Sequence, residues 1–429
     1  MTGVLTCALP IYLREKLLEA FLLRGEHGGA SDNRGIIAET LTLRAERAKL
    51  LGYSTYADFK LDDTMAGTTS AVRDLLDRVW SAGRKRALGE RERLQQMIRT
   101  EGGNFALAPH DWRYYSDKLR RAEYAIDEAE LRQYFPLDRM IEAAFFVAGE
   151  LFGLTFEERR DLPVYHPDVR AFEAKNRDGR HVALFYGDYF ARSSKRGGAW
   201  MSAFRSQQKL GGDVRPIIVN VLNITKPAPG EPALLGLDDA RTLFHEFGHA
   251  LHGMLSNVTY PTLAGTAVPT DFVELPSQLY EHWLLRPEVL RKFALHVKTN
   301  EPLPEELLRK VLAARTFNQG FATVEYCAST FVDLDMHLAD PGEARDPIAF
   351  EAATLSRIGK PAEIPMRHRS PHFAHVFSGE GYAAGYYSYL WSEALDADAF
   401  SAFEEKGDVF HRDRSEEHTS ELQSRGLIS

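Results

Sequence analysis

The chain has 429 residues, of which 44% are hydrophobic, so it is long enough to bury a sizeable core. Its formal net charge of −9 argues against a nucleic-acid partner, and no apolar run approaches the roughly 18 residues that a membrane-spanning helix needs. Only Cys7 and Cys327 are cysteines, so a disulfide framework is not possible and we expect a cytoplasmic protein.

Helical patterns dominate the first part of the chain, and we expect residues 12–153 to form a helical region. Apolar residues recur at helical spacing, among many charged residues, in five segments. These segments are residues 13–24, 34–51, 68–100 (one long or two short helices), 122–132 and 137–152.

The pattern changes over residues 154–235, which we expect to form a small mixed α/β region. Two runs of β-branched or aromatic residues, 182–187 and 216–222, are bounded by Gly, Pro and Asn and predict strands. Residues 226–236 are rich in proline and glycine and predict a loop.

Helical patterns return over residues 236–413. The first expected helix spans residues 238–255, and Asp238 or Asp239 can cap its N-terminus. Further helices are expected at residues 305–317, 321–337 and 347–358.

Residues 245–249 read His-Glu-Phe-Gly-His within the first of these helices. His245 and His249 are four positions apart and lie on one helix face, so both imidazoles can bind one metal ion. Glu246 follows the first histidine, where it can polarise a water on the metal. Glu274 would complete a His/His/Glu set with an open fourth position, as in catalytic zinc sites. The alternative is a pair of ordinary core histidines, whose burial without partners would be costly.

A second helix is expected to begin at Asp271. One of its faces carries Glu274, Gln278 and Glu281 at positions i, i+4 and i+7. Gln278 and Glu281 could orient the metal ligands through hydrogen bonds. The alternative for these two residues is a solvated helix face.

The glycine-rich stretch 375–391 offers phenolic and imidazole donors. Such donors on a mobile loop suit the stabilisation of the oxyanion that forms when water attacks a carbonyl. Tyr382 and Tyr389 lie seven positions apart and could share a helical face. For Tyr386 and Tyr387 we favour packing in a core with a nearby tryptophan.

With these segments in view, the chain resembles the thimet-oligopeptidase family of zinc metallopeptidases, and within it the bacterial peptidyl-dipeptidase (dipeptidyl carboxypeptidase) branch. The resemblance covers most of residues 12–413 and implies a mainly α, neurolysin/thimet-oligopeptidase-like fold with a small β-sheet beside the zinc helix. The stretches that carry it are residues 112–115, 241–253, 272–278, 317–326 and 375–391.

The resemblance implies a role for the residues of the metal site and the loop. His245, His249 and Glu274 match the ligands of one zinc ion per chain, and Glu246 matches the general base. Tyr389 matches the tyrosine that stabilises the tetrahedral intermediate. Residues 236–413 would then form the helical zinc catalytic region.

Other residues match the substrate side of the family's site. His375 matches a loop histidine, and Tyr382 matches a second loop tyrosine near the substrate. The segment 185–201 resembles the strand of the small sheet that binds the peptide backbone. The candidate substrate contacts are Gly198, Ala199, Tyr382 and Tyr386.

The implied function is zinc-dependent hydrolysis of short peptides with release of C-terminal dipeptides, and we expect a monomer. An endo-oligopeptidase of the same family is the alternative within this class. The alternative outside it is an inactive fragment that acts only as a helical binding module. The presence of ligands, base and loop tyrosines argues against that alternative.

Both ends of the chain read as foreign sequence. Residues 414–424 correspond to the in-frame translation of a common sequencing-library adapter, and residues 2–11 to its reverse complement, except at Leu5. We interpret residues 1–11 and 414–429 as adapter-derived; the alternative is a native polar tail. Family members extend beyond both ends, so we expect a fragment that lacks a front helical portion and one or two final helices. Re-sequencing the locus tests this interpretation.

Overall fold

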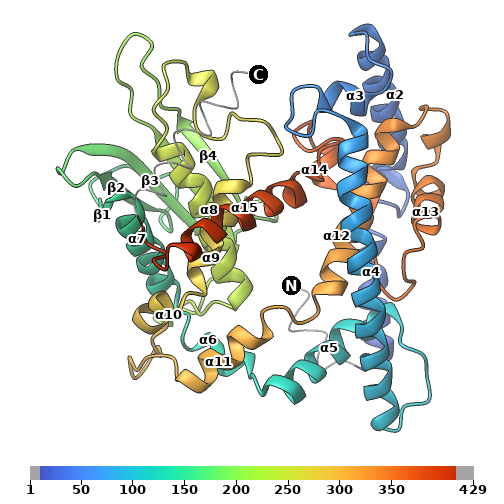
Figure 1. Cartoon of the computed structure of the whole chain (residues 1–429), viewed down its shortest axis with the longest axis horizontal. Coiled ribbons are helices and arrows are strands. Elements are labelled where there is room, and N and C mark those ends of the chain that lie inside the picture. The colour runs from blue at the N-terminus through green and yellow to red at the C-terminus, as the bar shows by residue number, and fades with distance from the viewer. Residues whose placement is uncertain (1–9, 412–429) are drawn as a thin grey trace. The chain divides into compact units, whose positions relative to one another are not determined.

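The computed structural model describes residues 10–411 of the chain. Apart from Pro10 and Ile11, the ends that we interpret as adapter-derived lie outside this range. The described residues form a mainly helical structure with one small sheet, which confirms the expected fold class (Figure 1). Among residues 10–411, no helix has both the length and the apolar character that crossing a membrane requires.

The helices occupy most of the described chain. The α-helices are α1 (Ile11–Leu22), α2 (Arg34–Leu50), α3 (Tyr56–Leu61), α4 (Thr69–Thr100), α5 (Pro109–Tyr124), α6 (Glu128–Arg132), α7 (Leu137–Phe152), α8 (Leu237–Met254), α9 (Leu275–Leu284), α10 (Pro287–Phe293), α11 (Glu305–Ala314), α12 (Gln319–Leu338), α13 (Pro347–Arg357), α14 (Ala374–Phe377) and α15 (Ser388–Glu405). Short 3-10 turns lie at Gly29–Ser31, Pro261–Leu263, Glu343–Arg345 and Ser370–His372.

The long charged segment expected as one or two helices is the single helix α4, which Thr68 begins by accepting a hydrogen bond from the Ala71 N–H. The helix expected over residues 122–132 is wrong, because Ala125 adopts a left-handed conformation (φ 48°) that ends α5 and separates it from α6.

The chain divides into two compact units. Unit 1 contains the described residues up to Ala125 together with Ala313–Trp391, and unit 2 contains Ile126–Leu312 together with the described residues from Ser392. Both units are discontinuous along the chain, whereas the regions expected from the sequence are consecutive. The expected regions group stretches of similar local structure, and the domain boundaries that they imply stay a prediction.

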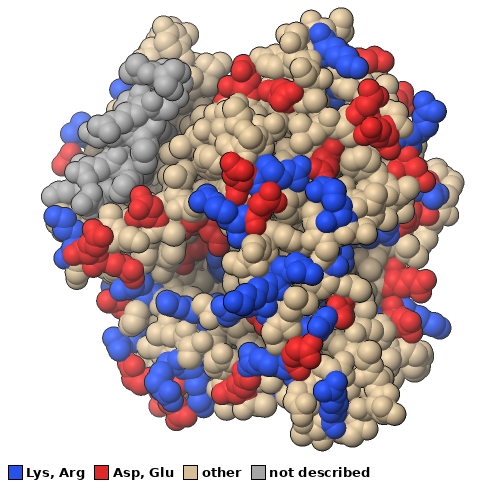
Figure 2. All heavy atoms as spheres, turned by 45° about the vertical axis from the view of Figure 1, so that its right-hand side comes forward, with Lys and Arg blue, Asp and Glu red and all other residues tan. Residues whose placement is uncertain are grey.

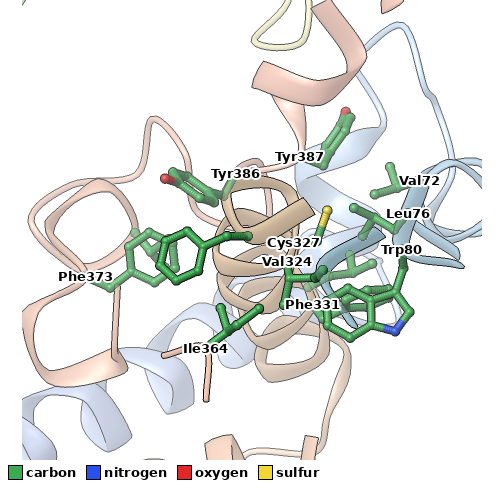
Figure 3. Packing of buried hydrophobic residues seen from close by; sticks show 14 of the residues in the cluster. Val72, Leu76, Trp80, Val324, Cys327, Phe331, Ile364, Phe373, Tyr386 and Tyr387 are labelled. Carbon is green, nitrogen blue, oxygen red and sulfur yellow. The ribbon is translucent and has the colours of Figure 1, made fainter. Parts of the chain in front are cut away.

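The core of unit 1 contains the long helices α4 and α12, which lie side by side (Figure 1). A Cβ atom on Gly320 would lie 2.4 Å from the backbone nitrogen of Ala87, so this glycine permits the close approach of the two helices. Figure 3 shows Cys327 and Phe331 of α12 packed near Trp80 of α4 in the buried core of the unit. The buried face of α12 therefore holds this helix against α4.

Unit 2 contains a five-stranded sheet with the order β1-β2-β3-β5-β4. The sequence predicted only two of these strands. Strands β3 and β5 pair in parallel and the other neighbours are antiparallel. The strands are β1 (Thr155–Glu158), β2 (Arg170–Lys175), β3 (His181–Phe190), β4 (Trp200–Arg205) and β5 (Ile217–Ile224).

Helix α8 packs against β5 and β4 of this sheet. A Cβ atom on Gly253 would lie 2.7 Å from Met201 Cε and 2.8 Å from Ile218 Cδ1, so the helix and sheet are in close contact at this glycine. On another side, α8 meets α9 at Gly248, where a Cβ atom would lie 2.7 Å from the carbonyl oxygen of Pro276. Glycine thus sets the distance between α8 and both neighbours.

Alanine in place of Gly248 is expected to reduce the free energy of unfolding by about 1–3 kcal/mol, because its methyl group would push α9 away from α8. Chemical denaturation measures this change. The matched control is Gly89→Ala in α4, where a Cβ atom meets no other atom within 4 Å and alanine should be neutral or stabilising. Equal effects of the two substitutions would contradict the close approach at Gly248.

The surface carries charges of both signs. Basic and acidic side chains are interspersed over the face seen in Figure 2. Many belong to exposed ion pairs, such as Arg180 with Asp178 at 3.0 Å and Arg291 with Glu305 at 2.6 Å. Exposed pairs of this kind contribute little to stability, so they mainly keep the surface hydrated.

Candidate metal centre

The helix that carries the His-Glu-Phe-Gly-His sequence begins one residue before its expected start. Gly236 is the N-cap residue of α8, and the Asp239 carboxylate accepts a hydrogen bond from its N–H at 2.9 Å. Neither Asp238 nor Asp239 is therefore the cap itself, but Asp239 satisfies the helix end from the third position. Phe244, Phe247 and other apolar residues bury the helix, so the two histidines lie on a rigid element.

The second predicted helix begins later than expected. Residues 271–274 form a turn, in which the N–H groups of Phe272 and Val273 donate to the carbonyl oxygen of Pro269. Helix α9 starts at Leu275, so Glu274 is its N-cap residue instead of a residue on its face. The Glu274 side chain is 2% exposed.

The three predicted ligands converge. The Nε2 atoms of His245 and His249 each lie 3.1 Å from Oε2 of Glu274, and one ligand atom from each residue lies within 4.8 Å of the others. The imidazole rings are 4.9 Å apart and nearly perpendicular, so their nitrogen lone pairs can meet at one point. Two imidazoles and a carboxylate are a donor set that zinc prefers.

The electrostatics of this cluster favour a bound cation. Burial opposes ionisation of Glu274, but hydrogen bonds from both histidines hold its pKa well below the usual range. Burial also opposes protonation of His245, yet Glu274 and Glu281 together raise its pKa to about 10. Two protons on the imidazoles would satisfy this buried carboxylate, and a divalent cation can take their place. The donor set therefore fits a metal ion.

Glu246 is also buried, with 5% of its surface exposed. Burial is the largest influence on its carboxyl group and raises its pKa. Its Oε2 atom accepts no hydrogen bond from the residues that the structure describes. A buried carboxylate oxygen without a donor is costly in a folded protein, which is typical of a group kept for proton transfer.

Glu281 holds the first histidine in place. Its Oε1 atom lies 2.7 Å from Nδ1 of His245, and its Oε2 atom forms an ion pair with Arg241. Burial opposes its ionisation, but the hydrogen bond to His245 and the charge of Arg241 lower its pKa. This contact fixes Nδ1 of His245 as the hydrogen-bond donor and leaves Nε2 for a metal. The Glu281 side chain is 11% exposed and hydrogen-bonded, so it does not lie on a solvated face.

Gln278 takes part in the same turn through its backbone. Its N–H donates to the carbonyl oxygen of Glu274 at 2.9 Å, which is the first hydrogen bond of α9. The side chain is half-buried. A role for that side chain in orienting the metal ligands stays a prediction.

Glutamine in place of Glu281 is expected to weaken metal binding by about 10–100-fold, because it removes the charge that Arg241 and His245 share. Competition with a chelator of known affinity measures the change. The control is Glu305→Gln, which removes an exposed carboxylate that also pairs with an arginine, Arg291. An affinity that Glu281→Gln leaves unchanged would contradict the orienting contact.

Three contacts of the site were not found from the sequence. Arg241 lies one helical turn before His245 and pairs with Glu281, a spacing that could have revealed it. Ser277 Oγ lies within hydrogen-bond distance of Glu274 at both its carbonyl oxygen (2.8 Å) and Oε2 (3.2 Å). Ser392 donates to the carbonyl oxygen of Asp271 at 2.8 Å, and its distance in sequence gave no local signal.

The predicted loop residues belong to unit 1. His375 lies in α14, Tyr389 lies in the first turn of α15, and Tyr382 lies in the turn between these helices. Tyr382 and Tyr389 therefore do not share a helical face as expected. The chain reversal instead stacks their rings at 5.3 Å with an angle of 12°, and the His375 ring lies 5.9 Å from that of Tyr382.

The expected core packing of the two central tyrosines is confirmed. Tyr386 and Tyr387 are 3% and 1% exposed, and Tyr387 packs edge-on against Trp391 at 6.2 Å. Figure 3 shows both tyrosines among the buried residues of unit 1. Tyr386 offers a substrate almost no area, and its role in substrate binding stays a prediction.

The segment 185–201 is not one strand as expected. It contains the end of β3, a loop over residues 191–199 and the start of β4. Gly198 has a φ of 95°, and its carbonyl oxygen accepts a hydrogen bond from Asn223 Nδ2 at 2.6 Å. Ala199 directly precedes β4, which is the terminal strand of the sheet in the described residues.

Comparisons with known proteins agree with this geometry. The sequence profile of peptidase family M3 matches residues 11–425. A dipeptidyl carboxypeptidase of Salmonella typhimurium is 44% identical over 398 residues, which are 92% of this chain and 58% of that protein. Oligopeptidase A of Escherichia coli is 39% identical over 424 residues, which are 96% of this chain and 62% of that protein.

A more distant relative, a thimet-like oligopeptidase of Dictyostelium discoideum, is 29% identical over 395 residues, 88% of this chain and 58% of that protein. The chain thus spans about three fifths of the length of these three relatives, 58–62%. The match to the family profile covers nearly the whole chain and confirms the resemblance found from its motifs. The chain belongs to peptidase family M3.

Proposed function

We propose that this protein hydrolyses oligopeptides with the help of one zinc ion and releases dipeptides from their C-termini. The observation that carries the proposal is the convergence of His245, His249 and Glu274 beside the buried carboxylate of Glu246. The dipeptidyl carboxypeptidases among the relatives, at 44% identity, support the release of dipeptides.

His245, His249 and Glu274 would hold the zinc ion, with Glu281 orienting His245 through its Nδ1 atom. When bound, zinc acts as a Lewis acid that polarises a carbonyl group and lowers the pKa of a water ligand to about 7. The three side chains leave a fourth ligand position for this chemistry.

Glu246 would be the general base. Its Oε2 atom has no hydrogen-bond donor among residues 10–411 and can accept the proton of the attacking water. Burial raises the pKa of Glu246 toward the range in which a carboxyl group can also hold that proton. The same group then gives the proton to the nitrogen of the leaving amine. One residue thus serves both proton transfers of the hydrolysis.

The roles of the loop residues rest on the sequence match. By that match, Tyr389 donates a hydrogen bond to the oxyanion of the tetrahedral intermediate, and Tyr382 and His375 lie on the substrate side. The mutual ring contacts of these three residues support a common function.

Strand β4 would bind the substrate backbone. It pairs with β5 along one side only, in the described residues, so its other side can add an extended peptide as a further strand. Backbone pairing of this kind reads few side chains, which suits an enzyme that accepts many short peptides. Gly198 and Ala199, just before β4, would contact the same peptide.

An endo-oligopeptidase is the second candidate, because the oligopeptidase A relatives align with 96% of the chain. An inactive helical binding module is the third candidate, and the presence of all three candidate ligands and the base argues against it. A monomeric state and a cytoplasmic location are further proposals.

Mass analysis of the products from one peptide with a free or an amidated C-terminus tests the specificity. A peptidyl-dipeptidase should release the C-terminal dipeptide from the free peptide and be much slower on the amide, because it needs the carboxylate. Internal cleavage of both peptides would favour the endo-oligopeptidase. Peptide binding without any cleavage, in the zinc-loaded protein, would favour the binding module.

A further inference from the structure

One buried carboxylate in unit 1 holds the backbone of the turn between α14 and α15. Asp333 of α12 is 2% exposed. Its two oxygens accept hydrogen bonds from the N–H groups of Ala384 (2.9 Å) and Tyr386 (3.0 Å). These contacts join residues that are more than fifty positions apart in the chain. The turn is therefore tied to α12 at two points.

A buried histidine, His337, connects Asp333 to a second buried charged residue, Arg44. Nδ1 of His337 lies 3.1 Å from Oδ1 of Asp333 and 2.8 Å from its carbonyl oxygen. Nε2 of the same ring lies 3.0 Å from Nη1 of Arg44. Because a guanidinium group can only donate, Nε2 must accept and Nδ1 must carry the proton that Asp333 accepts. The imidazole thus links the charges of Arg44 and Asp333.

Arg44 also reaches the start of this turn. Its Nη2 group donates to the carbonyl oxygens of Val376 (2.7 Å) and Gly379 (2.8 Å). Ala384 has a φ of 54°, a conformation that a residue with a Cβ atom rarely adopts unless its surroundings impose it. The hydrogen bond from its N–H to Asp333 is such a constraint.

The anchored part of the turn lies next to the tyrosines that the sequence match assigns to catalysis. Tyr386 is three residues before Tyr389, and its carbonyl oxygen accepts a hydrogen bond from the Tyr326 hydroxyl. The N–H of Ser388, the first residue of α15, donates to the carbonyl oxygen of Gly385. The backbone that leads into Tyr389 is thus held by hydrogen bonds to α12 and within the turn. This differs from the mobile loop expected from the glycines.

We propose that Asp333 is a positioning residue of the peptidase, which holds the turn in the one conformation that stacks Tyr382 on Tyr389. His337 and Arg44 keep the Asp333 charge in place by donating along one line of hydrogen bonds. The inference rests on the proposed function for the role of Tyr389. Its structural part, the anchoring of the turn, stands on the contacts within unit 1.

A double-mutant cycle with Asp333→Asn and Tyr389→Phe tests the proposal. Asparagine keeps the shape of Asp333, but its amide nitrogen cannot accept one of the two N–H groups. Loss of an oxyanion donor should make Tyr389→Phe about 10²-fold slower in kcat. Asp333→Asn should also lower kcat with little change in KM, and the double variant should be no slower than the slower single variant, because both act through one hydroxyl. Independent effects that multiply, or an unchanged kcat in either single variant, would overturn the proposal.

Asp335→Asn is the matched control. Asp335 lies on the same helix two positions away and pairs with Arg73 and Arg357, without contacting the turn. Its substitution can lower stability, but it should leave kcat within about 2-fold of the unaltered protein, because the ion pairs that it removes are with Arg73 and Arg357 and not with the turn. A loss of kcat equal to that of Asp333→Asn would mean that general destabilisation explains both, and would overturn the proposal.

Hydrogen exchange keeps the anchoring testable without activity. The amide protons of Ala384 and Tyr386 should exchange at least about 10-fold faster in Asp333→Asn than in Asp335→Asn, because only the first substitution opens their hydrogen bonds. Equal exchange would overturn the proposal. Absence of peptidase activity in the unaltered protein would refute the proposed function, whereas the exchange comparison would still decide whether Asp333 holds the turn. If Asp333→Asn does not fold, Asp333→Glu, which keeps the charge beside His337 but displaces both oxygens, replaces it.

Discussion

Glutamine in place of Glu246 is expected to lower kcat by roughly 10²–10⁴-fold while the protein keeps its zinc. Glutamine has the shape of glutamate but cannot take up a proton, so it removes the base without removing a ligand. The Nε2 atoms of His245 and His249 and the Glu274 carboxylate stay where they are. Steady-state kinetics with a short peptide, and elemental analysis of the same sample, measure the two quantities.

The stability of this variant separates a catalytic from a structural role. Burial disfavours the charged form of Glu246, and its Oε2 atom has no donor among the described residues. A neutral amide removes the cost of that buried charge, so the melting temperature should stay the same or rise. A lower melting temperature together with a loss of zinc would show instead that Glu246 supports the fold of the site. Retained turnover would refute its role as the base.

Alanine in place of His249 is expected to reduce the zinc content from about one ion per chain to a small fraction, and with it all peptidase activity. Only two ligands remain, and the Glu274 carboxylate loses one of its two histidine partners. Added zinc should then no longer raise the melting temperature, because an ion that is not bound cannot stabilise the native state. Elemental analysis after gel filtration and a thermal melt with and without zinc measure both effects.

His252→Ala is the matched control. His252 is buried on the same helix, one turn after His249, and burial lowers its pKa to about 4, so its imidazole is neutral near pH 7. It is not part of the cluster formed by His245, His249 and Glu274. This variant should keep about one zinc per chain even if it is less stable. Equal loss of zinc in both variants would mean that disturbance of α8, and not removal of a ligand, causes the effect.

Long helices with a clear apolar face were predictable from the sequence. The expected bounds of α7 agree with the structure, because eight of its residues are buried at helical spacing. The strands β1 and β4 were not predictable, since most of their residues are exposed and carry no alternating pattern. Their pairing with β2 and β5 depends on contacts that the local sequence does not encode.

The residues of the candidate metal site also differ in whether the local sequence could predict them. The helical spacing of His245 and His249 is a local property and was readable directly. Glu274 was also proposed from the sequence, but on the face of a helix that was expected to begin at Asp271. The structure has a turn there, because the Phe272 and Val273 N–H groups donate to the carbonyl oxygen of Pro269. Ser392 and Asp333 act across long stretches of chain, so only the folded structure reveals their contacts.

Titration of the metal-free protein with zinc, followed by hydrolysis of a short peptide, tests the central claim most directly. Chelation should abolish hydrolysis, and activity should return in proportion to added zinc and reach its plateau at one equivalent per chain, since His245, His249 and Glu274 form one site. Hydrolysis that survives complete removal of metal, or a fully zinc-loaded protein that cleaves no peptide, would contradict the assignment of this cluster as the catalytic centre.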